Sequence, residues 1–231
     1  MDWTVIPSYG NMLLLGLVTT LKLLLVSGIA GFAFAVIVAF ARISRNPLIA
    51  NASKGFTALI RGTPLLVQIY ILYYGVGSLF AQWPWLRTSV LWPFLRDGFW
   101  YVALALVVSV GAYVGEVIRA GLRGVPKGEL EAARAMGMRP LLIVRRVWLP
   151  RAIQILLPTL AGESVMLLKS TALASTVAVM DVLGAANYIR AQTLRTYEPL
   201  LAIAVIYVVL AYLIERGFGY LERRVPVRSA R

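Results

Sequence analysis

The sequence predicts an all-α integral membrane protein, and three observations lead to that prediction. Of the 231 residues, 60% are hydrophobic and only 14% are charged, a balance more apolar than that of soluble domains. The apolar residues gather into five runs of about 20 residues or more, the length of a helix that crosses a bilayer. The basic residues are concentrated in alternate segments between these runs, which is typical of loops on the cytoplasmic side.

Each apolar run is expected to be a helix, because backbone polar groups inside a bilayer must find partners within the chain. The fourth run contains Pro158, Gly162 and Glu163, and we expect the helix to open locally there. The start, Met1-Asp2-Trp3, has no basic segment, and the first run is too long for a signal peptide, so it is kept as structure. We predict a single transmembrane domain, 1–231, with spans at 13–41, 56–80, 99–120, 153–173 and 200–218.

The distribution of Lys and Arg predicts the orientation. Segments 42–61, 119–151 and 216–231 hold 17 of the 23 basic residues, and the positive-inside rule assigns these segments to the cytoplasm. The N-terminus is then outside and the C-terminus inside. The net charge of +13 is therefore mainly a topology signal. A nucleic-acid-binding protein would need basic residues interleaved with aromatic ones on a soluble face, and the sequence contains no such module. Four tryptophans of the predicted outer loop suit the membrane interface: Trp83, Trp85, Trp92 and Trp100.

The composition also excludes several kinds of chemistry. The chain has no Cys and no His, which removes disulfides, His-based zinc sites and catalytic triads. A membrane-embedded enzyme would need a cluster of reactive groups at one depth, whereas the spans contain a single clearly central acid, Glu163. No G-x-x-x-x-G-K-[ST] motif is present, so the chain itself is not predicted to hold ATP phosphates.

The charged segment 126–150 contains ELEAARAMGMRPLLIVRRVWLP, Glu129 to Pro150. Gly137 is expected to end one short helix and Pro140 to begin another. Neither helix is long enough to cross the membrane. Two interpretations follow: an amphipathic helix lying on lipid headgroups, or a docking helix whose small residues let a cytosolic partner approach closely.

The segment resembles a known signature. Its spacing of Glu131-Ala132-Ala133, Gly137, Val147 and Leu149-Pro150 is similar to the EAA motif of permease subunits in bacterial ABC importers. Four further stretches resemble the polar amino-acid branch, including the histidine/lysine/arginine/ornithine and opine permeases. One departure is Gly162, where many relatives have Asn. The stretches are GLVTTLKLLLVS (16–27), RGTPLLVQIYILYYG (61–75), AYVGEVIRAGLRGVPKGELEAARAMG (112–137) and LPTLAGESVMLLKSTALAS (157–175).

The resemblance implies a five-helix permease of the ABC type I importer class in the bacterial inner membrane. It implies that Glu131, Ala132, Ala133 and Gly137 transmit motion from two cytosolic ATP-binding subunits, which would hold ATP and Mg. A second permease subunit, identical or homologous, and a periplasmic or lipid-anchored amino-acid-binding protein are the other implied partners. This chain would need no cofactor and have no catalytic residues.

Glu163 is the first candidate for substrate binding. A carboxylate in the middle of a span is costly unless it is paired or hydrated, so intramembrane acids are functional candidates by default. It could meet a cationic side chain of the substrate, as the matching Glu of the basic amino-acid branch implies, or pair structurally with a base such as Lys22. Gln68 is either interhelical glue or part of the pore lining. Lys169 either extends to the interface or receives a substrate carboxylate.

Other polar residues have structural interpretations. Glu116 and Arg119 are one helical turn apart and are expected to pair, with gating as the less favoured role. Residues 61–64 are expected to shape the cytoplasmic entry to the second span. Asp181 either caps a short outer helix or contacts a binding protein.

The predicted function is that of half of an import pathway for a basic amino acid (arginine, lysine, histidine or ornithine) or an opine. A neutral or acidic substrate such as glutamine or glutamate is the alternative within transport. A membrane assembly subunit without a transport path is the alternative of another class, and it predicts that Glu163 is dispensable.

Overall fold

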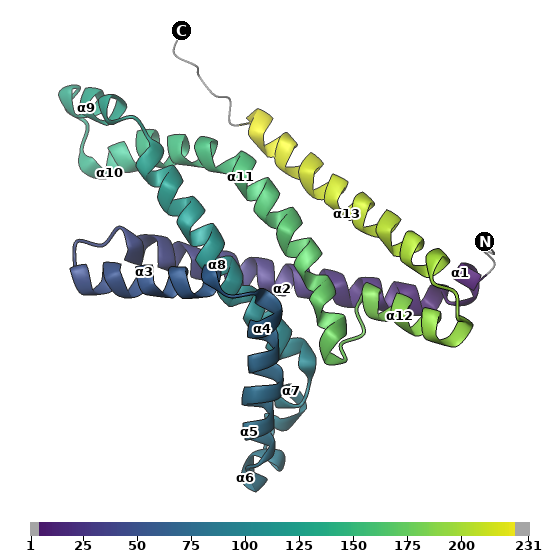
Figure 1. Cartoon of the computed structure of the whole chain (residues 1–231). Helices are drawn as coiled ribbons and strands as arrows, with labels where there is room; N and C mark the ends of the chain where they lie inside the picture. Colours follow the sequence, from purple (N-terminus) through teal and green to yellow (C-terminus); the bar gives the residue numbers. More distant parts are fainter. Residues whose placement is uncertain (1–4, 225–231) are drawn as a thin grey trace.

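The computed structural model describes residues 5–224, and every regular element in that range is a helix (Figure 1). Met1-Asp2-Trp3 and the tail residues Arg228 and Arg231, on which the predicted topology also drew, lie outside the described residues. The elements are α1 (Val5–Ser8), α2 (Gly10–Arg42), α3 (Pro47–Gly62), α4 (Leu65–Tyr70), η1 (Ile71–Val76), α5 (Gly77–Ala81), α6 (Pro84–Arg87), α7 (Trp92–Leu95), α8 (Gly98–Gly124), α9 (Lys127–Ala135), α10 (Pro140–Ile143), η2 (Val144–Trp148), α11 (Leu149–Ser170), η3 (Thr171–Val177), α12 (Val182–Thr193) and α13 (Tyr197–Arg224).

Within residues 5–224, four stretches of helix are long and apolar enough to cross a membrane, and a bent pair of helices supplies a fifth crossing when it is counted as one. Each overlaps one of the five predicted spans and extends beyond it. The structure is thus an all-α membrane fold, as predicted. The four stretches are Gly10–Arg42, Gly98–Gly124, Pro140–Val177 and Tyr197–Arg224, and the bent pair is Pro47–Gly62 with Leu65–Ala81.

The predicted second span, 56–80, is not one continuous helix. The chain bends by 101° between the two halves. Pro64 has no N–H, and its ring holds Thr63 in an extended conformation, φ −114° and ψ 142°. Helix α3 therefore packs against α2 and α8. Helices α4 and η1 pack against α8, with Ile69 buried in the core, and α5 then projects away from the other long helices (Figure 1).

Helices α2 and α8 form the centre of the fold because glycines let them approach closely. A Cβ added to Gly31 would lie 2.7 Å from Val110, and one added to Gly115 would lie 2.9 Å from Val38. Such distances are shorter than real Cβ contacts, so only glycine fits. Small residues at helix interfaces are typical of membrane proteins, where van der Waals packing drives association. Leu23 and the α8 residues Val102 and Leu106 are buried in the resulting core.

Helix α12 closes the end of the fold near the start of α2. Its N-cap, Asp181, accepts a hydrogen bond of 2.8 Å from the backbone N–H of Gly184. The N–H of Val182 donates to Oγ1 of Thr20 on α2 over 3.1 Å. Gly16 on α2 lies so close that an added Cβ would be 2.7 Å from the main-chain oxygen of Asp181. The two segments are therefore tied together by backbone contacts.

Candidate functional site

Glu163 projects from a continuous helix. The backbone of α11 stays helical from Leu149 to Ser170, with Pro158 inside it. The predicted local opening of the helix at Pro158 is therefore wrong. A proline removes one intrahelical hydrogen bond, and the bonds on either side are sufficient to keep this helix intact. The carboxylate is consequently presented from a regular helix face and not from an unwound loop.

The half-buried side chain of Glu163 lines a cavity of about 200 Å³ between α4, α8 and α11. A second hollow of about 240 Å³ also touches Glu163 and extends to Phe218 on α13. Glu163 is the only charged residue among the described residues that line the two spaces. The lining of the first cavity combines three further polar side chains with apolar ones: Ser109, Tyr113, Ser170, Leu65, Leu106, Val110, Met166 and Leu167.

Glu163 has no hydrogen bond or ion pair with any other described residue. The structural pairing with Lys22, considered from the sequence, is not formed, and Lys22 is exposed on α2. Arg61, at the end of α3, is near enough to interact electrostatically with Glu163, but the two do not form an ion pair. The carboxylate oxygens are therefore available to a ligand in the cavity.

The other two predicted substrate residues lie elsewhere. The Gln68 amide donates to the main-chain oxygens of Ile60 (2.8 Å) and Thr63 (3.2 Å) and to the Thr63 hydroxyl (2.9 Å). It joins the two halves of the bend, which agrees with the interpretation as glue. Lys169 is exposed in the last turn of α11. Neither residue is among the described residues that line the cavity.

Tyr113 belongs to the cavity, and the sequence analysis missed it. Ser109 and Tyr113 are four residues apart on α8, and Glu163 and Ser170 are seven apart on α11, so each pair shares a helix face. A search for polar residues at helical spacing within apolar runs would have found this signal.

Helix α9 and the turn after it fold as the sequence predicts, because their signals are local. The second predicted short helix does begin at Pro140, but α10, η2 and α11 follow one another without a gap as the spanning stretch Pro140–Val177. The prediction that neither helix is long enough to cross the membrane is therefore wrong for the second. Helix α9 ends at Ala135, and Gly137 has a left-handed φ of 74°. The N–H groups of Gly137 and Met138 donate to the main-chain oxygens of Arg134 (2.9 Å) and Ala133 (3.2 Å). This pair of bonds is the Schellman motif that ends helices at glycine. The prediction that Gly137 ends a helix is confirmed.

The four predicted coupling residues are not equally accessible. Glu131, Ala132 and Gly137 are exposed, whereas Ala133 is buried. The surface open to a partner is therefore formed by the other three residues and by Met136, which is 82% exposed.

Two polar contacts attach segment 126–150 to the long helices. Nε of Arg151, in the first turn of α11, lies 3.1 Å from Oε1 of Glu129 on α9. Nε1 of Trp148 donates to the main-chain oxygen of Leu122 on α8 over 2.8 Å. An apolar groove of about 410 Å³ between α9 and α10 is lined by Leu130, Arg134, Met138, Pro140, Ile143, Val144 and Trp148. The segment is therefore held as one unit against α8 and α11.

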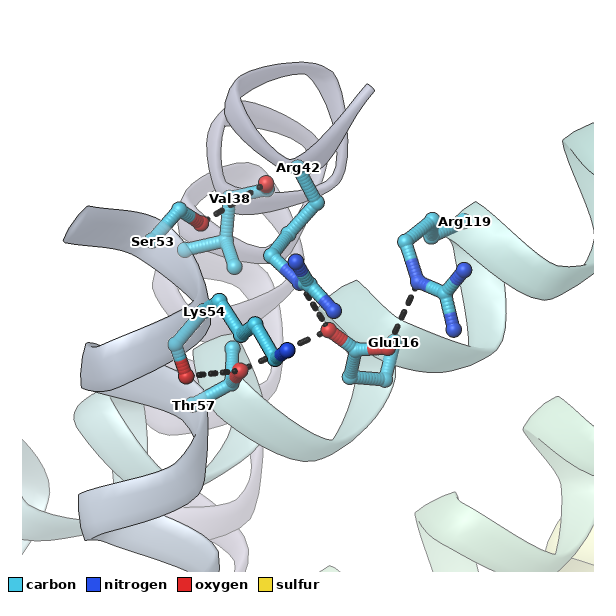
Figure 2. A network of polar contacts seen from close by, with 7 residues as sticks. All are labelled: Val38, Arg42, Ser53, Lys54, Thr57, Glu116 and Arg119. Atoms are coloured by element: carbon cyan, nitrogen blue, oxygen red, sulfur yellow. Dashed lines mark hydrogen bonds and ion pairs between the residues drawn. The ribbon is translucent and has the colours of Figure 1, made fainter. Parts of the chain in front are cut away.

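Figure 2 shows a charged cluster in which one carboxylate joins three helices. Glu116 on α8 accepts a hydrogen bond from Nε of Arg119 over 2.6 Å, one from Nε of Arg42 at the end of α2, and one from Oγ1 of Thr57 on α3 over 3.4 Å. The predicted Glu116–Arg119 pair is confirmed. The contacts with Arg42 and Thr57 had no local signal, because these residues are 74 and 59 positions away from Glu116 in the chain. The cluster fixes the relative positions of α2, α3 and α8.

Asp181 has the capping role, the first of its two sequence interpretations. Its side chain is completely buried, so it is not exposed to a partner. One oxygen, Oδ1, caps α12, whereas Oδ2 has no hydrogen-bond partner among the described residues. Burial raises the pKa of this carboxyl group to about 6, because an ionised group is poorly solvated there.

The fold and the site define a class: an all-α membrane subunit with a charged segment at one end and an unpaired carboxylate facing a cavity between its long helices. Among the described residues no group of three potential metal ligands is found. Residues 12–227 match the family described as "Binding-protein-dependent transport system inner membrane component". The chain belongs to this family, and the predicted resemblance to ABC importer permeases is confirmed.

Similar proteins of named function cover most of the chain. The octopine transport system permease protein OccM of Rhizobium meliloti is 40% identical over 210 residues, 91% of this chain and 84% of the relative. The nopaline transport system permease protein NocM of Agrobacterium fabrum is 37% identical, over 88% of this chain and 83% of the relative. The histidine/lysine/arginine/ornithine transport system permease protein HisM of Salmonella typhimurium is 37% identical, over 90% of this chain and 88% of the relative.

Solved structures agree on the fold. A chain of a crystal structure described as an amino acid ABC transporter with histidines superposes with a TM-score of 0.82, is 32% identical, and covers 97% of this chain and 99% of its own. A chain of the inward-facing MetNI methionine ABC transporter superposes with a TM-score of 0.71 at 22% identity, and the match covers 93% of this chain and 96% of the other. The second likeness supports the fold alone.

Proposed function

We propose that this chain forms half of the translocation pathway of an ATP-driven importer for a basic amino acid or an opine. The observation that carries the proposal is the unpaired carboxylate of Glu163 in the cavity wall between α4, α8 and α11. An ionised acid among apolar helices is costly when it lacks a partner. A guanidinium or ammonium group of the substrate would supply that partner.

The names of the similar proteins support this substrate class. Two of them are permease proteins for octopine and nopaline, and a third for histidine, lysine, arginine and ornithine. A carboxylate selects these substrates over glutamate by charge, because like charges repel at short range. Glutamine would gain a neutral hydrogen bond instead of a charge-assisted one, which is roughly half as strong.

The cavity is built by one chain from three helices, and its open side requires a second permease subunit, identical or homologous, to enclose a pathway. Two cytosolic ATP-binding subunits would contact the exposed Glu131, Ala132 and Gly137 and would hold ATP and Mg. A periplasmic or lipid-anchored binding protein would deliver the substrate on the other side. In this arrangement the N-terminus is outside and the C-terminus is in the cytoplasm of a bacterium.

The work of this chain is then noncovalent. Glu163 binds the cationic group, the helices exclude water around it, and a movement transmitted through segment 126–150 exposes the cavity to the cytoplasm. Bond making and breaking belong to the ATP-binding subunits, so the chain needs no catalytic residue.

Uptake competition tests the proposal. Labelled arginine uptake into proteoliposomes with the complete importer is measured against unlabelled lysine, histidine, ornithine, glutamine and glutamate. We expect the cationic amino acids to compete, and Glu163→Gln to reduce arginine uptake about 30-fold or more, as for the loss of a charge-assisted contact. Glu215→Gln, a change at an exposed acid on α13, is the matched control. Arginine uptake that is indifferent to Glu163→Gln contradicts the proposal and favours a subunit without a path.

A further inference from the structure

We propose that Arg61 binds the carboxylate of the substrate. The site would then recognise both charged groups of a dipolar molecule, because Arg61 binds the negative group and Glu163 binds the cationic group. This inference rests on the proposed function, because it requires Glu163 to hold the cationic group. It assigns to residues 61–64 a role in recognition beyond the shaping of an entry.

Arg61 is held at the edge of the cavity by one of the residues that line it. Its guanidinium lies over the ring of Tyr113, 5.2 Å from the centroid. The Tyr113 hydroxyl donates to the main-chain oxygen of Arg61 over 3.4 Å. A guanidinium stacked on an aromatic face keeps its N–H donors free at its edge. The two contacts therefore place unused donors beside the cavity.

The charges of Arg61 and Glu163 are opposite, close and uncompensated. Within residues 5–224 the Arg61 guanidinium makes no hydrogen bond or ion pair, and the same is true of the Glu163 carboxylate. They act on each other electrostatically without closing into a salt bridge. A ligand with a carboxylate and a cation can bridge this gap, and the arginine fork matches a carboxylate with two parallel hydrogen bonds.

The position of Arg61 is fixed by the bend that follows it. The Gln68 amide bonds the main-chain oxygens of Ile60 and Thr63, which lie on either side of Arg61 at the end of α3. Arg61, like Lys22 and Lys169, is exposed and is not itself among the described residues that line the cavity. It differs from the two lysines because its guanidinium lies over Tyr113, which does line the cavity, and because it interacts electrostatically with Glu163.

The test compares arginine with L-argininamide, which has the same shape and side chain but no negative end. The full-length chain is purified with its partner subunits in nanodiscs, without binding protein, and binding of labelled arginine and its displacement by L-argininamide are measured. We expect the wild-type complex to prefer arginine by about tenfold, near the lower end of the range for hydrogen bonds to charged groups, because Arg61 is more exposed to solvent than Glu163. Arg61→Gln should weaken the binding of arginine about tenfold and change the affinity for argininamide by less than about twofold.

Two further variants make the result specific. Arg61→Lys keeps the charge but loses the paired N–H donors of the guanidinium, so we expect an intermediate loss of about threefold in arginine affinity. This variant also serves as the test if the Arg61→Gln complex does not assemble. Arg45→Gln removes an exposed arginine from the α2–α3 turn and should leave both ligands unaffected.

The outcomes separate this inference from the proposed function. The role of Arg61 in binding the carboxylate is overturned if Arg61→Gln weakens the binding of arginine and argininamide equally, or changes the binding of neither. It is also overturned if Arg61→Gln tightens arginine binding, which would mean that Arg61 competes with the substrate for Glu163. Arginine binding that survives Glu163→Gln unchanged, or is absent from the wild-type complex, overturns the proposed function and this inference with it.

Discussion

The indole N–H of Trp148 donates a hydrogen bond of 2.8 Å to the main-chain oxygen of Leu122. Leu122 lies in the last turn of α8, where carbonyl groups have no partner within the helix. Trp148 also lines the groove between α9 and α10. One side chain therefore completes the end of a long helix and holds segment 126–150 against it.

Replacing this tryptophan should loosen the attachment of segment 126–150. In Trp148→Phe the carbonyl of Leu122 loses its donor, and we expect a loss of about 1 kcal/mol in stability. Binding-protein-stimulated ATP hydrolysis should fall relative to the basal rate, because the segment is no longer fixed to α8. Thermal unfolding and ATPase assays of the purified importer measure both. Trp100→Phe, at an exposed tryptophan, is the control, and equal losses in the two variants would contradict the interpretation.

Gly137 is needed for its backbone conformation and not for space. An added Cβ would meet nothing within 4 Å, but φ is +74°. Gly137→Ala should therefore destabilise the turn by about 1 kcal/mol and reduce copurification of the ATP-binding subunits. Gly137→Asn should be milder, since Asn tolerates this conformation.

Gly128→Ala supplies the comparison within the same segment. Gly128 lies on α9, and an added Cβ also meets nothing within 4 Å, so this variant should be neutral or slightly stabilising. If Gly137→Asn proves as harmful as Gly137→Ala, close contact with a partner, and not φ, would be the reason for the glycine.

Glu116 should be important for stability. In Glu116→Gln two arginines lose their shared counter-charge in a largely buried place, where the side chains of Glu116 and Arg42 are 12% and 16% exposed. We expect a loss of about 2 kcal/mol, below the value for a fully buried pair. Arg119→Gln should cost less, because Arg42 still neutralises Glu116. Melting temperatures of the purified complex test the ranking, and a larger loss for Arg119→Gln would reverse it.

Asp181 should make stability depend on pH. Its pKa is raised from 3.8 to about 6 in the folded protein, so the folded state binds the proton more tightly than the unfolded state. The contribution of Asp181 to stability is then greatest below about pH 4, falls as the pH rises from about 4 to 6, and levels off above, with a total change of up to about 3 kcal/mol.

Asp181→Asn keeps an oxygen that can cap α12 but cannot ionise. The variant should therefore be more stable than the wild type at pH 7 and lose most of the fall between pH 4 and 6. Thermal unfolding of both proteins across this range measures the difference. An unchanged pH profile in Asp181→Asn would assign the dependence to other groups.

Features with local signals could be predicted from the sequence. Gly137 and Pro140 marked the turn in segment 126–150, and the spacing of Glu116 and Arg119 marked their ion pair. The bend at Pro64 carried a local signal too, but the continuous apolar run concealed it. At Pro158 the same residue type is accommodated within a helix, so proline alone does not decide between a bend and a continuous helix.

Features that join distant parts of the chain could not be predicted. Glu163 was identified because a lone acid in an apolar run is conspicuous, but its neighbours Tyr113 and Arg61 come from two other helices. Gly31 and Val110 meet across the α2–α8 contact although nothing in either local sequence pairs them. Such contacts depend on how whole helices pack.

The close packing of α2 on α8 has a mechanical consequence. Because Gly31 and Gly115 leave no space for α2 and α8 to slide past each other, and Glu116 is hydrogen-bonded to Arg42 at the end of α2, we expect the two helices to move together as one rigid body. Helix α8 leads into α9 across only Val125 and Pro126. A force applied to α9 should therefore displace α2 and α8 together, and with them the part of the cavity wall that contains Tyr113, instead of only bending α8.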